Sequence, residues 1–211
     1  MRTLAIDCAT EGCSVALFDD GTLVEGKHEI LGRGHAERLV PMIAELPGKG
    51  RAERIIVSLG PGSFTGVRIG LAAARALGLA WNARVEGYPA LALVAAQALD
   101  LEPGARDAGG VSICMNGGHG QYFVQNFDGS GSKQDEVRSL VPAEAGVSIR
   151  HRLIAGNRAL QLAEGLGEGC QALDCLPDAR NAHLLGQVQF LSDLSPIYGR
   201  GPDARPPGTP R

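Results

Sequence analysis

Aromatic residues are scarce in this 211-residue sequence, where they make up only 4% of the chain. Proteins that bind single-stranded nucleic acid directly usually present aromatic side chains on which bases stack, so the composition argues against that class. A basic excess is missing as well, because 20 lysine and arginine residues stand against 23 acidic ones, a net charge of −3. We therefore expect RNA, if it is a target, to be reached through a partner.

Long hydrophobic runs and paired cysteines are also absent. The most apolar stretch, 69–81, contains Arg75 and is shorter than the roughly 20 residues that span a bilayer. The N-terminal apolar run meets Asp7 too early for a signal peptide. The five cysteines form no C-x-x-C pair, so neither a disulfide framework nor a zinc site is indicated. We expect a cytoplasmic protein without membrane contact, with reduced cysteines.

Glycine, by contrast, is abundant, with 30 residues in the chain. The glycines follow no three-residue period, which excludes collagen. Hydrophobic residues make up 44% and charged residues 20%, which excludes a disordered chain. At roughly 150 residues per domain, the length predicts one large domain or two small lobes.

The first hundred residues contain strand patterns followed by an alternation of helices and strands. The turn Asp19-Asp20-Gly21 is a strong hairpin signal, and Pro47-Gly48 ends the first helical pattern. The predicted strands are 3–6, 13–18, 22–28, 54–58 and 84–86, and the predicted helices are 35–46, 65–79 and 91–99.

The opening pattern returns in the second half. An offset of 109 residues (116 − 7) places Asp7 on Asn116, Phe18 on Phe127 and Asp19 on Asp128. The predicted strands there are 111–115, 121–127 and 153–155, and the predicted helices are 157–166 and 182–194. We predict an N-terminal lobe (1–100), a linker (101–110), a C-terminal lobe (111–195) and a partly disordered tail (196–211).

A duplicated unit of three strands and helices resembles the actin-like ATPase superfamily, which has the ribonuclease H-like fold. The resemblance implies an α/β protein of two small lobes, each with a mixed sheet flanked by helices, and a nucleotide site between the lobes. With only about 100 residues per lobe, there is little room for the insertions of a full kinase.

Two turns are candidates for a vestigial phosphate site. The first carries Asp7 and Thr10, where backbone N–H groups could cradle phosphate; alternatively, Asp7 closes the turn by accepting N–H bonds. The second lies between a strand and a helix, where an anion can bind, but it matches neither a Walker loop nor a Rossmann fingerprint. Its Ser63 could also be a plain helix N-cap. The candidate residues are Asp7, Thr10, Gly60, Gly62 and Ser63.

Small residues form a stripe along the helix predicted at 65–79. Gly66, Gly70, Ala74 and Gly78 follow one another every four residues. Each interior glycine costs about 1 kcal/mol relative to alanine, so the stripe needs a reason. The helix either packs tightly inside its own lobe or docks against a partner's helix. Because a lobe of this size has few helices of its own, we predict a partner interface.

No catalytic residue and no metal site are predicted. His35 and Glu37 are two residues apart and do not share a helical face, and the sequence contains no H-E-x-x-H or H-x-x-x-H. None of the cysteines lies in a nucleophile-elbow or cysteine-protease context. We expect no cofactor beyond weak binding of ATP or ADP.

Three strings and the C-terminal ending carry a more specific resemblance. The strings are Ala5-Ile6-Asp7-x-Ala9-Thr10, Gly32-Arg33-Gly34-His35-Ala36-Glu37-Arg38-Leu39-x-Pro41-x-Ile43 and Gly60-Pro61-Gly62-Ser63-Phe64-Thr65-Gly66-Val67-Arg68-Ile69-Gly70, and the ending is Pro196-x-Tyr198-x-Arg200-x-x-Asp203-Ala204. Together they resemble the bacterial TsaB (YeaZ) family. In the second lobe, Asn116-Gly117-Gly118-His119-Gly120 departs from the family's usual Asp-Ala-Arg-Arg-Gly turn.

The resemblance implies a non-catalytic subunit in the synthesis of threonylcarbamoyladenosine on tRNA. Such a subunit binds its paralogue TsaD, which holds the metal and transfers the threonylcarbamoyl group, and the small ATPase TsaE joins them. It meets tRNA only through the complex and forms a homodimer when alone. The predicted interface comprises His35, Arg38, Leu39, Thr65, Gly66, Arg68, Ile69, Gly70, Ala73, Ala74 and Leu77.

Two other functions stay open at this point. A stand-alone actin-like ATPase or phosphotransferase would use Asp7, Thr10 and Ser63 around the phosphates. A metalloprotease, which the older glycoprotease label of the family suggests, would need a bound metal.

Overall fold

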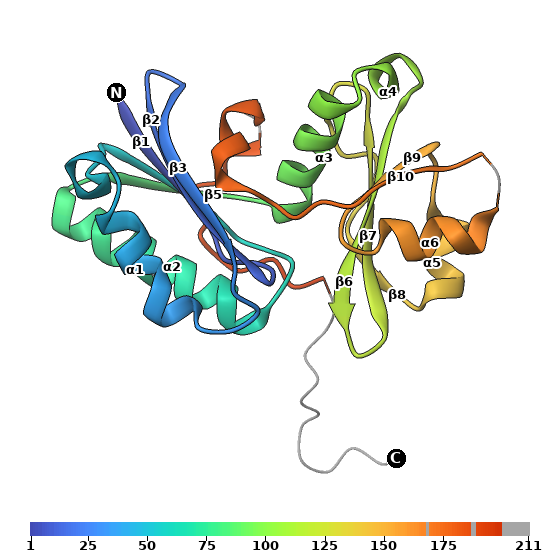
Figure 1. Cartoon of the computed structure of the whole chain (residues 1–211), viewed down its shortest axis with the longest axis horizontal. Coiled ribbons are helices and arrows are strands. Elements are labelled where there is room, and N and C mark those ends of the chain that lie inside the picture. The colour runs from blue at the N-terminus through green and yellow to red at the C-terminus, as the bar shows by residue number, and fades with distance from the viewer. Residues whose placement is uncertain (168, 187–188, 200–211) are drawn as a thin grey trace, which may run out of the picture.

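A computed structural model of the chain describes residues 1–167, 169–186 and 189–199. Within these ranges the chain forms two α/β lobes, each built on a five-stranded mixed sheet. Figure 1 shows helices on the outer faces of both sheets and a further helical layer between them. The predicted fold, two small lobes with helix-flanked mixed sheets, is confirmed.

The sheet of the first lobe has the strand order β3-β2-β1-β4-β5. Its first three strands are antiparallel neighbours and the last two continue in parallel, as the hairpin signal and the later helix–strand alternation predict. Asp20 and Gly21 both adopt a positive φ, 46° and 81°, in the predicted hairpin turn. The strands are β1 (Arg2–Asp7), β2 (Gly12–Asp19), β3 (Thr22–Ile30), β4 (Arg54–Ser58) and β5 (Arg84–Tyr88).

Helices cover both faces of this sheet. α1 (His35–Ala44) and α2 (Phe64–Trp81) lie on its outer face, and the short 3-10 helix η1 (Pro47–Gly50) follows α1. α3 (Ala90–Leu101) and the 3-10 helix η2 (Ala179–Leu184) lie between the two sheets (Figure 1). The ten residues 90–99 of α3 are all buried, because a helix between two sheets meets protein on every side.

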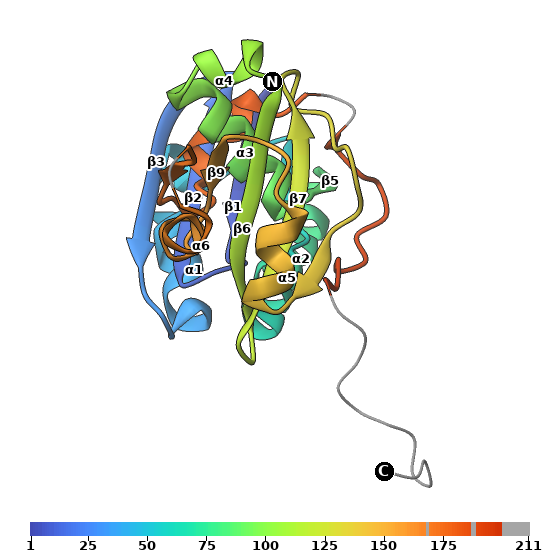
Figure 2. The ribbon, with the colours of Figure 1, turned by 90° about the vertical axis from the view of Figure 1, so that its right-hand side faces the viewer.

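The second sheet repeats the topology of the first. Its strand order, β10-β9-β6-β7-β8, matches that of the first sheet when one of the two is read in reverse, with β6 in the place of β1. Figure 2 shows α5 and α6 in front of this sheet, on its outer face. The elements are α4 (Gly104–Asp107), β6 (Gly110–Gly118), β7 (Gln121–Asp128), β8 (Arg138–Leu140), α5 (Pro142–Ser148), β9 (Leu153–Ala155), α6 (Ala159–Leu166) and β10 (Gln171–Leu173).

The first turns of the two lobes are equivalent in detail. The Asp7 carboxylate accepts a hydrogen bond from the N–H of Ala9 at 2.9 Å, and the Asn116 side chain accepts one from the N–H of Gly118 at 3.1 Å. The predicted offset of 109 residues relates Asp7 to Asn116 and Ala9 to Gly118. The strand register differs by one residue, which an irregularity between Asn116 and Gly118 accommodates.

Two predicted segments differ from the structure. The stretch predicted as a linker, 101–110, contains α4 and the start of β6. The helix predicted over 182–194 is wrong: η2 ends at Leu184, and Leu191 instead exchanges backbone hydrogen bonds with Gly87 at the edge of β5. The apolar residues there have tertiary partners, so their spacing does not reflect a helix. The sequence analysis also did not predict β8, β10, α4 or α5.

The C-terminal segment returns to the first lobe. The N–H of Ile197 donates to the carbonyl of Leu59 at 2.8 Å, and the Arg54 guanidinium lies 4.3 Å from the ring centroid of Phe190. Residues 200–211, on which most of the predicted disordered tail falls, lie outside the described residues. The boundaries between the lobes stay a prediction.

The stripe of small residues faces the protein's own sheet, which corrects the expectation of an exposed docking stripe. A Cβ atom added to Gly66 would overlap the carbonyl oxygen of Cys8, and one added to Gly78 would overlap the side chain of Val85. Ala74 is fully buried. The small side chains let α2 lie close against β1, β4 and β5.

Two alanine substitutions in α2 should distinguish a glycine in close backbone contact from a glycine with room for a Cβ atom. Gly66→Ala should lower the free energy of unfolding by about 1–3 kcal/mol, because backbone must move to admit the Cβ. Gly70→Ala is the matched control, since its Cβ would meet Val57 Cγ2 at 3.5 Å, an ordinary contact. It should be neutral or stabilise by up to about 1 kcal/mol. Urea denaturation measures both, and a larger loss at Gly70 would contradict the packing.

Candidate functional site

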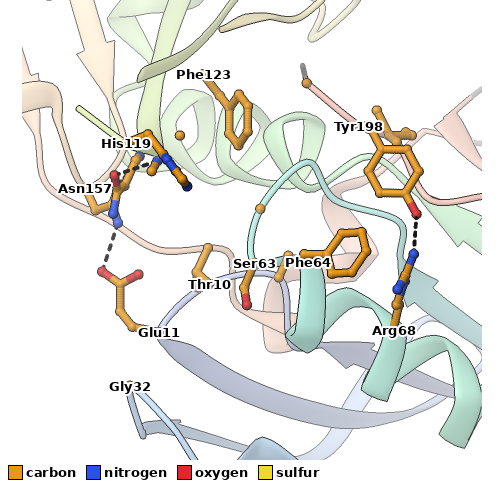
Figure 3. A pocket seen from close by; sticks show the side chains of 17 residues that line it. Thr10, Glu11, Gly32, Ser63, Phe64, Arg68, His119, Phe123, Asn157 and Tyr198 are labelled. Atoms are coloured by element: carbon orange, nitrogen blue, oxygen red, sulfur yellow. Dashed lines mark hydrogen bonds between the residues drawn. The ribbon is translucent and has the colours of Figure 1, made fainter. Parts of the chain in front are cut away.

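A cleft of about 1030 Å³ separates the two lobes (Figure 3). From the first lobe it is lined by the β1–β2 turn and by the loop that begins α2. The β6–β7 turn and Asn157 line it from the second lobe, and residues 197–199 close one end. A volume of this size is typical of small-molecule sites.

Asp7 does not reach this cleft. Its side chain is buried, with Oδ1 bonded to the N–H of Ala9 and Oδ2 3.2 Å from the hydroxyl of Tyr88. Burial raises the pKa of Asp7 to about 6, although these hydrogen bonds act in the opposite direction. The alternative interpretation, a residue that closes its own turn, fits this geometry.

The glycine-rich loop packs directly on that turn. The N–H of Ser63 donates to the carbonyl of Ala9 at 2.6 Å, and a Cβ added to Gly62 would overlap the same carbonyl oxygen. The N–H of Gly66 bonds to Ser63 Oγ at 3.2 Å, so Ser63 is a helix N-cap.

Four backbone amides of these two loops are already hydrogen-bonded within the protein. A phosphate cradle needs backbone N–H groups directed at the ligand. Here the amides of Ala9, Gly12, Ser63 and Gly66 donate to acceptors within the protein. Of the five candidate residues, Thr10, Gly62 and Ser63 line the cleft, whereas Asp7 and Gly60 are not among its lining residues.

A hydrogen-bonded bridge joins the two lobes across the cleft. Asn157 Nδ2 donates to Glu11 Oε1 at 2.8 Å, and Asn157 Oδ1 accepts the N–H of Asn116 at 2.8 Å (Figure 3). This connects the equivalent turns of the two lobes. Sequence reasoning missed Asn157, and the available signal was its place just after the strand at 153–155.

Phe64, Arg68 and Tyr198 form a cluster on the cleft wall (Figure 3). The Arg68 guanidinium lies 3.5 Å from the centroid of the Phe64 ring, a cation–π contact, and donates to the Tyr198 hydroxyl at 3.2 Å. The two aromatic side chains are 56% and 54% exposed. Arg68, predicted as an interface residue, is therefore also part of the cleft.

The predicted interface residues separate into two groups. His35, Leu39, Gly66, Gly70 and Ala74 are buried within the first lobe, which corrects their assignment to an exposed surface. His35, for example, has its Nε2 2.9 Å from the carbonyl oxygen of Thr10, so it holds the β1–β2 turn. The remaining six, which lie at least partly at the surface, are Arg38, Thr65, Arg68, Ile69, Ala73 and Leu77.

Arg38 belongs to a surface network with two glutamates. It bonds to Glu29 and Glu45, and these bonds raise the pKa of Arg38. The same contact with Arg38, helped by Lys27, lowers the pKa of Glu45 to about 2. Because all these groups are at the surface, the network contributes little to stability.

Another ion-pair cluster ties η2 to the first sheet. Asp178 lies 3.3 Å from His28 Nδ1 and bonds to Arg180. Burial alone would raise the pKa of Asp178, but the hydrogen bonds from His28 and Arg180 outweigh it and hold the pKa at about 2.

No group of three or more His, Cys, Asp or Glu side chains is placed to hold a metal ion in the part of the chain that the structure describes. Among the same residues, no helix is both long enough and apolar enough to cross a membrane.

Two duplicated lobes around a central cleft define a protein of the actin-like ATPase fold. The inorganic polyphosphate/ATP-glucomannokinase of Arthrobacter shares this fold, with a TM-score of 0.51 at 13% identity over 87% of this chain and 95% of that one. YeaZ from Pseudomonas aeruginosa is more similar, with a TM-score of 0.77 at 26% identity over 93% of this chain and 99% of that one.

Sequence comparison identifies the family. The sequence model described as "TsaD: tRNA N6-adenosine threonylcarbamoyltransferase" matches residues 28–177. The tRNA threonylcarbamoyladenosine biosynthesis protein TsaB of Escherichia coli is 45% identical over 84 residues, 37% of this chain and 36% of that protein. The chain belongs to the TsaB (YeaZ) family. Its matches to the TsaB proteins of Escherichia coli and Haemophilus influenzae span 36% and 51% of their lengths.

Replacing Asp7 with asparagine should remove a pH dependence of stability. The pKa of about 6 in the folded protein exceeds the ordinary value of 3.8, so stability falls as the pH rises from about 4 to about 6. The difference corresponds to about 3 kcal/mol. Asp7→Asn cannot ionise, so its free energy of unfolding, compared with wild type, should rise by about 2 kcal/mol of this total between about pH 4 and 6.

Asp178→Asn is the control with the opposite sign. The pKa of Asp178, about 2 when folded, lies below the ordinary 3.8, so its contribution is present above about pH 4 and is lost as the pH falls towards 2. The difference in free energy of unfolding between Asp178→Asn and wild type should therefore stay constant between about pH 4 and 6. If urea denaturation gives Asp7→Asn the same constant difference, the Asp7 carboxyl is not buried as described.

Proposed function

We propose that the chain acts in the synthesis of threonylcarbamoyladenosine on tRNA, as a non-catalytic subunit that binds a TsaD-like paralogue. The observation that carries this proposal is the match of residues 28–177 to the threonylcarbamoyltransferase family, together with relatives named for the biosynthesis of this nucleoside. A tRNA-modifying role also implies a cytoplasmic protein.

The outer face of α1 and α2 is the proposed docking surface. It presents Val40, 57% exposed, and Leu79, 88% exposed, together with the exposed Ala72 and Ala76. Ile69, at the same face, is half-buried. These apolar side chains lie beside the exposed Arg75, on a face turned away from the second lobe (Figure 1). A paralogue with the same duplicated fold would offer a matching helical face.

The proposed non-catalytic role rests on burial and hydrogen bonding in the β1–β2 turn and in the loop before α2. The Asp7 carboxylate is buried, and the amides of Ala9, Gly12, Ser63 and Gly66 donate to the protein itself. With its net charge of −3, the chain would meet tRNA only through the complex. A TsaE-like ATPase completes the proposed assembly, and without the paralogue two copies of this chain would pair through the same helical face.

A charged substitution on α2 tests the docking surface. Ala76→Arg places a cation on an exposed position, so the fold should be retained. Burying this cation against an apolar partner should weaken binding of a TsaD-like protein by about tenfold or more, as titration calorimetry would measure. Leu160→Arg is the matched control on α6, where Leu160 is 49% exposed on the other lobe. Equal affinity of both variants and wild type would contradict the proposed face.

A stand-alone ATPase is the second candidate, and the cleft of about 1030 Å³ is the observation in its favour. Because Asp7 is buried and four of the loop amides are already bonded, we expect no saturable heat when ATP and Mg²⁺ are titrated into the protein at micromolar concentrations. Micromolar binding that is weakened by Thr10→Ala and hydrolysis that is lost in Asp7→Asn would instead support the ATPase. Elemental analysis of the purified protein tests the metalloprotease.

A further inference from the structure

Two cysteine side chains meet beneath the β1–β2 turn. The Sγ atoms of Cys8 and Cys13 lie 3.7 Å apart, and both residues are buried. They flank the turn 9–12 and continue the antiparallel register beyond its last pair, Asp7 and Ser14. Directly opposed residues of such a ladder have Cα atoms about 4.5–5.5 Å apart, a separation that a disulfide can bridge.

We propose that Cys8 and Cys13 form a reversible disulfide in the presence of a peroxide or a small disulfide oxidant. The two Sγ atoms have to approach from 3.7 Å to the bonded distance of about 2.05 Å. The strand register already aligns the two side chains, so rotation of the side chains with a small backbone adjustment is sufficient. This modification site goes beyond the proposed function and does not depend on it.

The contact between the two thiols sets the order of the chemical steps. The hydrogen bond from the Cys8 thiol lowers the pKa of Cys13, while the same contact and burial raise the pKa of Cys8. The Cys13 thiolate therefore attacks hydrogen peroxide first. The O–O bond breaks, Cys13 becomes a sulfenic acid, and the released hydroxide takes up a proton to become water.

The second step closes the disulfide. The Cys8 sulfur attacks the Cys13 sulfur, the S–OH bond breaks, and the hydroxide leaves with the Cys8 proton as a second water. In total, two thiols are oxidised to one disulfide and one peroxide is reduced to two waters. With a small disulfide as the oxidant, thiol exchange yields the same cross-link and releases two small thiols.

The turn 9–12 lies between the cysteine pair and the cleft. It therefore bears on both the route of the oxidant and the effect of the cross-link. Ala9, Thr10 and Glu11 line the cleft, so in the proposed reaction the oxidant enters from the cleft and this turn has to open locally to admit it. Glu11 also accepts the hydrogen bond from Asn157 that joins the lobes. A cross-link from Cys8 to Cys13 would hold this wall of the cleft in place.

A second cysteine pair serves as an internal control. Cys170 and Cys175 are also five residues apart and are only half-buried, which makes them more accessible. The extended strand β10, Gln171–Leu173, lies between them and separates them by roughly 10 Å, too far for a disulfide. Trypsin releases the two pairs in separate peptides, 3–27 and 159–180, that contain no other cysteine.

The experiment compares these peptides after oxidation of the whole folded protein. Graded hydrogen peroxide is added, free thiols are alkylated with iodoacetamide without prior reduction, and the digest is analysed by mass spectrometry. Peptide 3–27 should lose both alkylation sites together with two hydrogens, and dithiothreitol should restore them. Peptide 159–180 should form no internal cross-link.

Two single substitutions, one at each cysteine, separate the two steps. Cys8→Ser should lose the cross-link and retain Cys13 as a sulfenic acid that dimedone traps, whereas Cys13→Ser should leave Cys8 without dimedone adduct. The proposal is overturned if peptide 3–27 of the wild type keeps two alkylated cysteines at peroxide concentrations that oxidise peptide 159–180. Cross-linking of Cys8 or Cys13 only to a second chain would overturn it as well.

Discussion

The close backbone contact between the β1–β2 turn and the loop before α2 is the constraint on which the first lobe depends. The carbonyls of Cys8 and Ala9 lie where Cβ atoms of Gly66 and Gly62 would otherwise be. Ser63 adds a hydrogen bond from its N–H to Ala9. Only residues without a side chain allow two loops to approach this closely. The contact fixes the start of α2 on the sheet, and with it one wall of the cleft.

The same contact also determines which polar groups beside the cleft are already hydrogen-bonded. The amides of Ser63 and Gly66, which lie at the loop before α2, donate to neighbouring protein atoms. The carboxylate of Asp7 is turned into the lobe and bonded to Ala9 and Tyr88. These hydrogen bonds stabilise the two loops and fix their position beside the cleft.

The duplicated architecture also explains which helical faces are exposed. α3 and η2 occupy the space between the sheets, so the helical faces that stay open are those of α1 and α2 on one side and α5 and α6 on the other. The small residues of α2 are used to bring this helix close to its own sheet. The opposite face of α2 stays exposed, with Leu79 88% exposed, and it is the face on which the proposed docking surface lies.

The sequence by itself determined the duplicated order of the longer elements and the family. Alternating apolar residues and the Asp19-Asp20-Gly21 turn predicted the hairpin, and the offset of 109 residues predicted the duplicated lobe, because local patterns encode strands, turns and repeats. The short elements β8, β10 and α5 have too few residues for a clear period. The segment after η2 has helical spacing but is held by Gly87 and Leu59 of the first lobe. Only the tertiary structure decided which way the stripe of α2 faces, that Asp7 is buried, and that Asn157 bridges the lobes, because each depends on contacts between residues far apart in the chain.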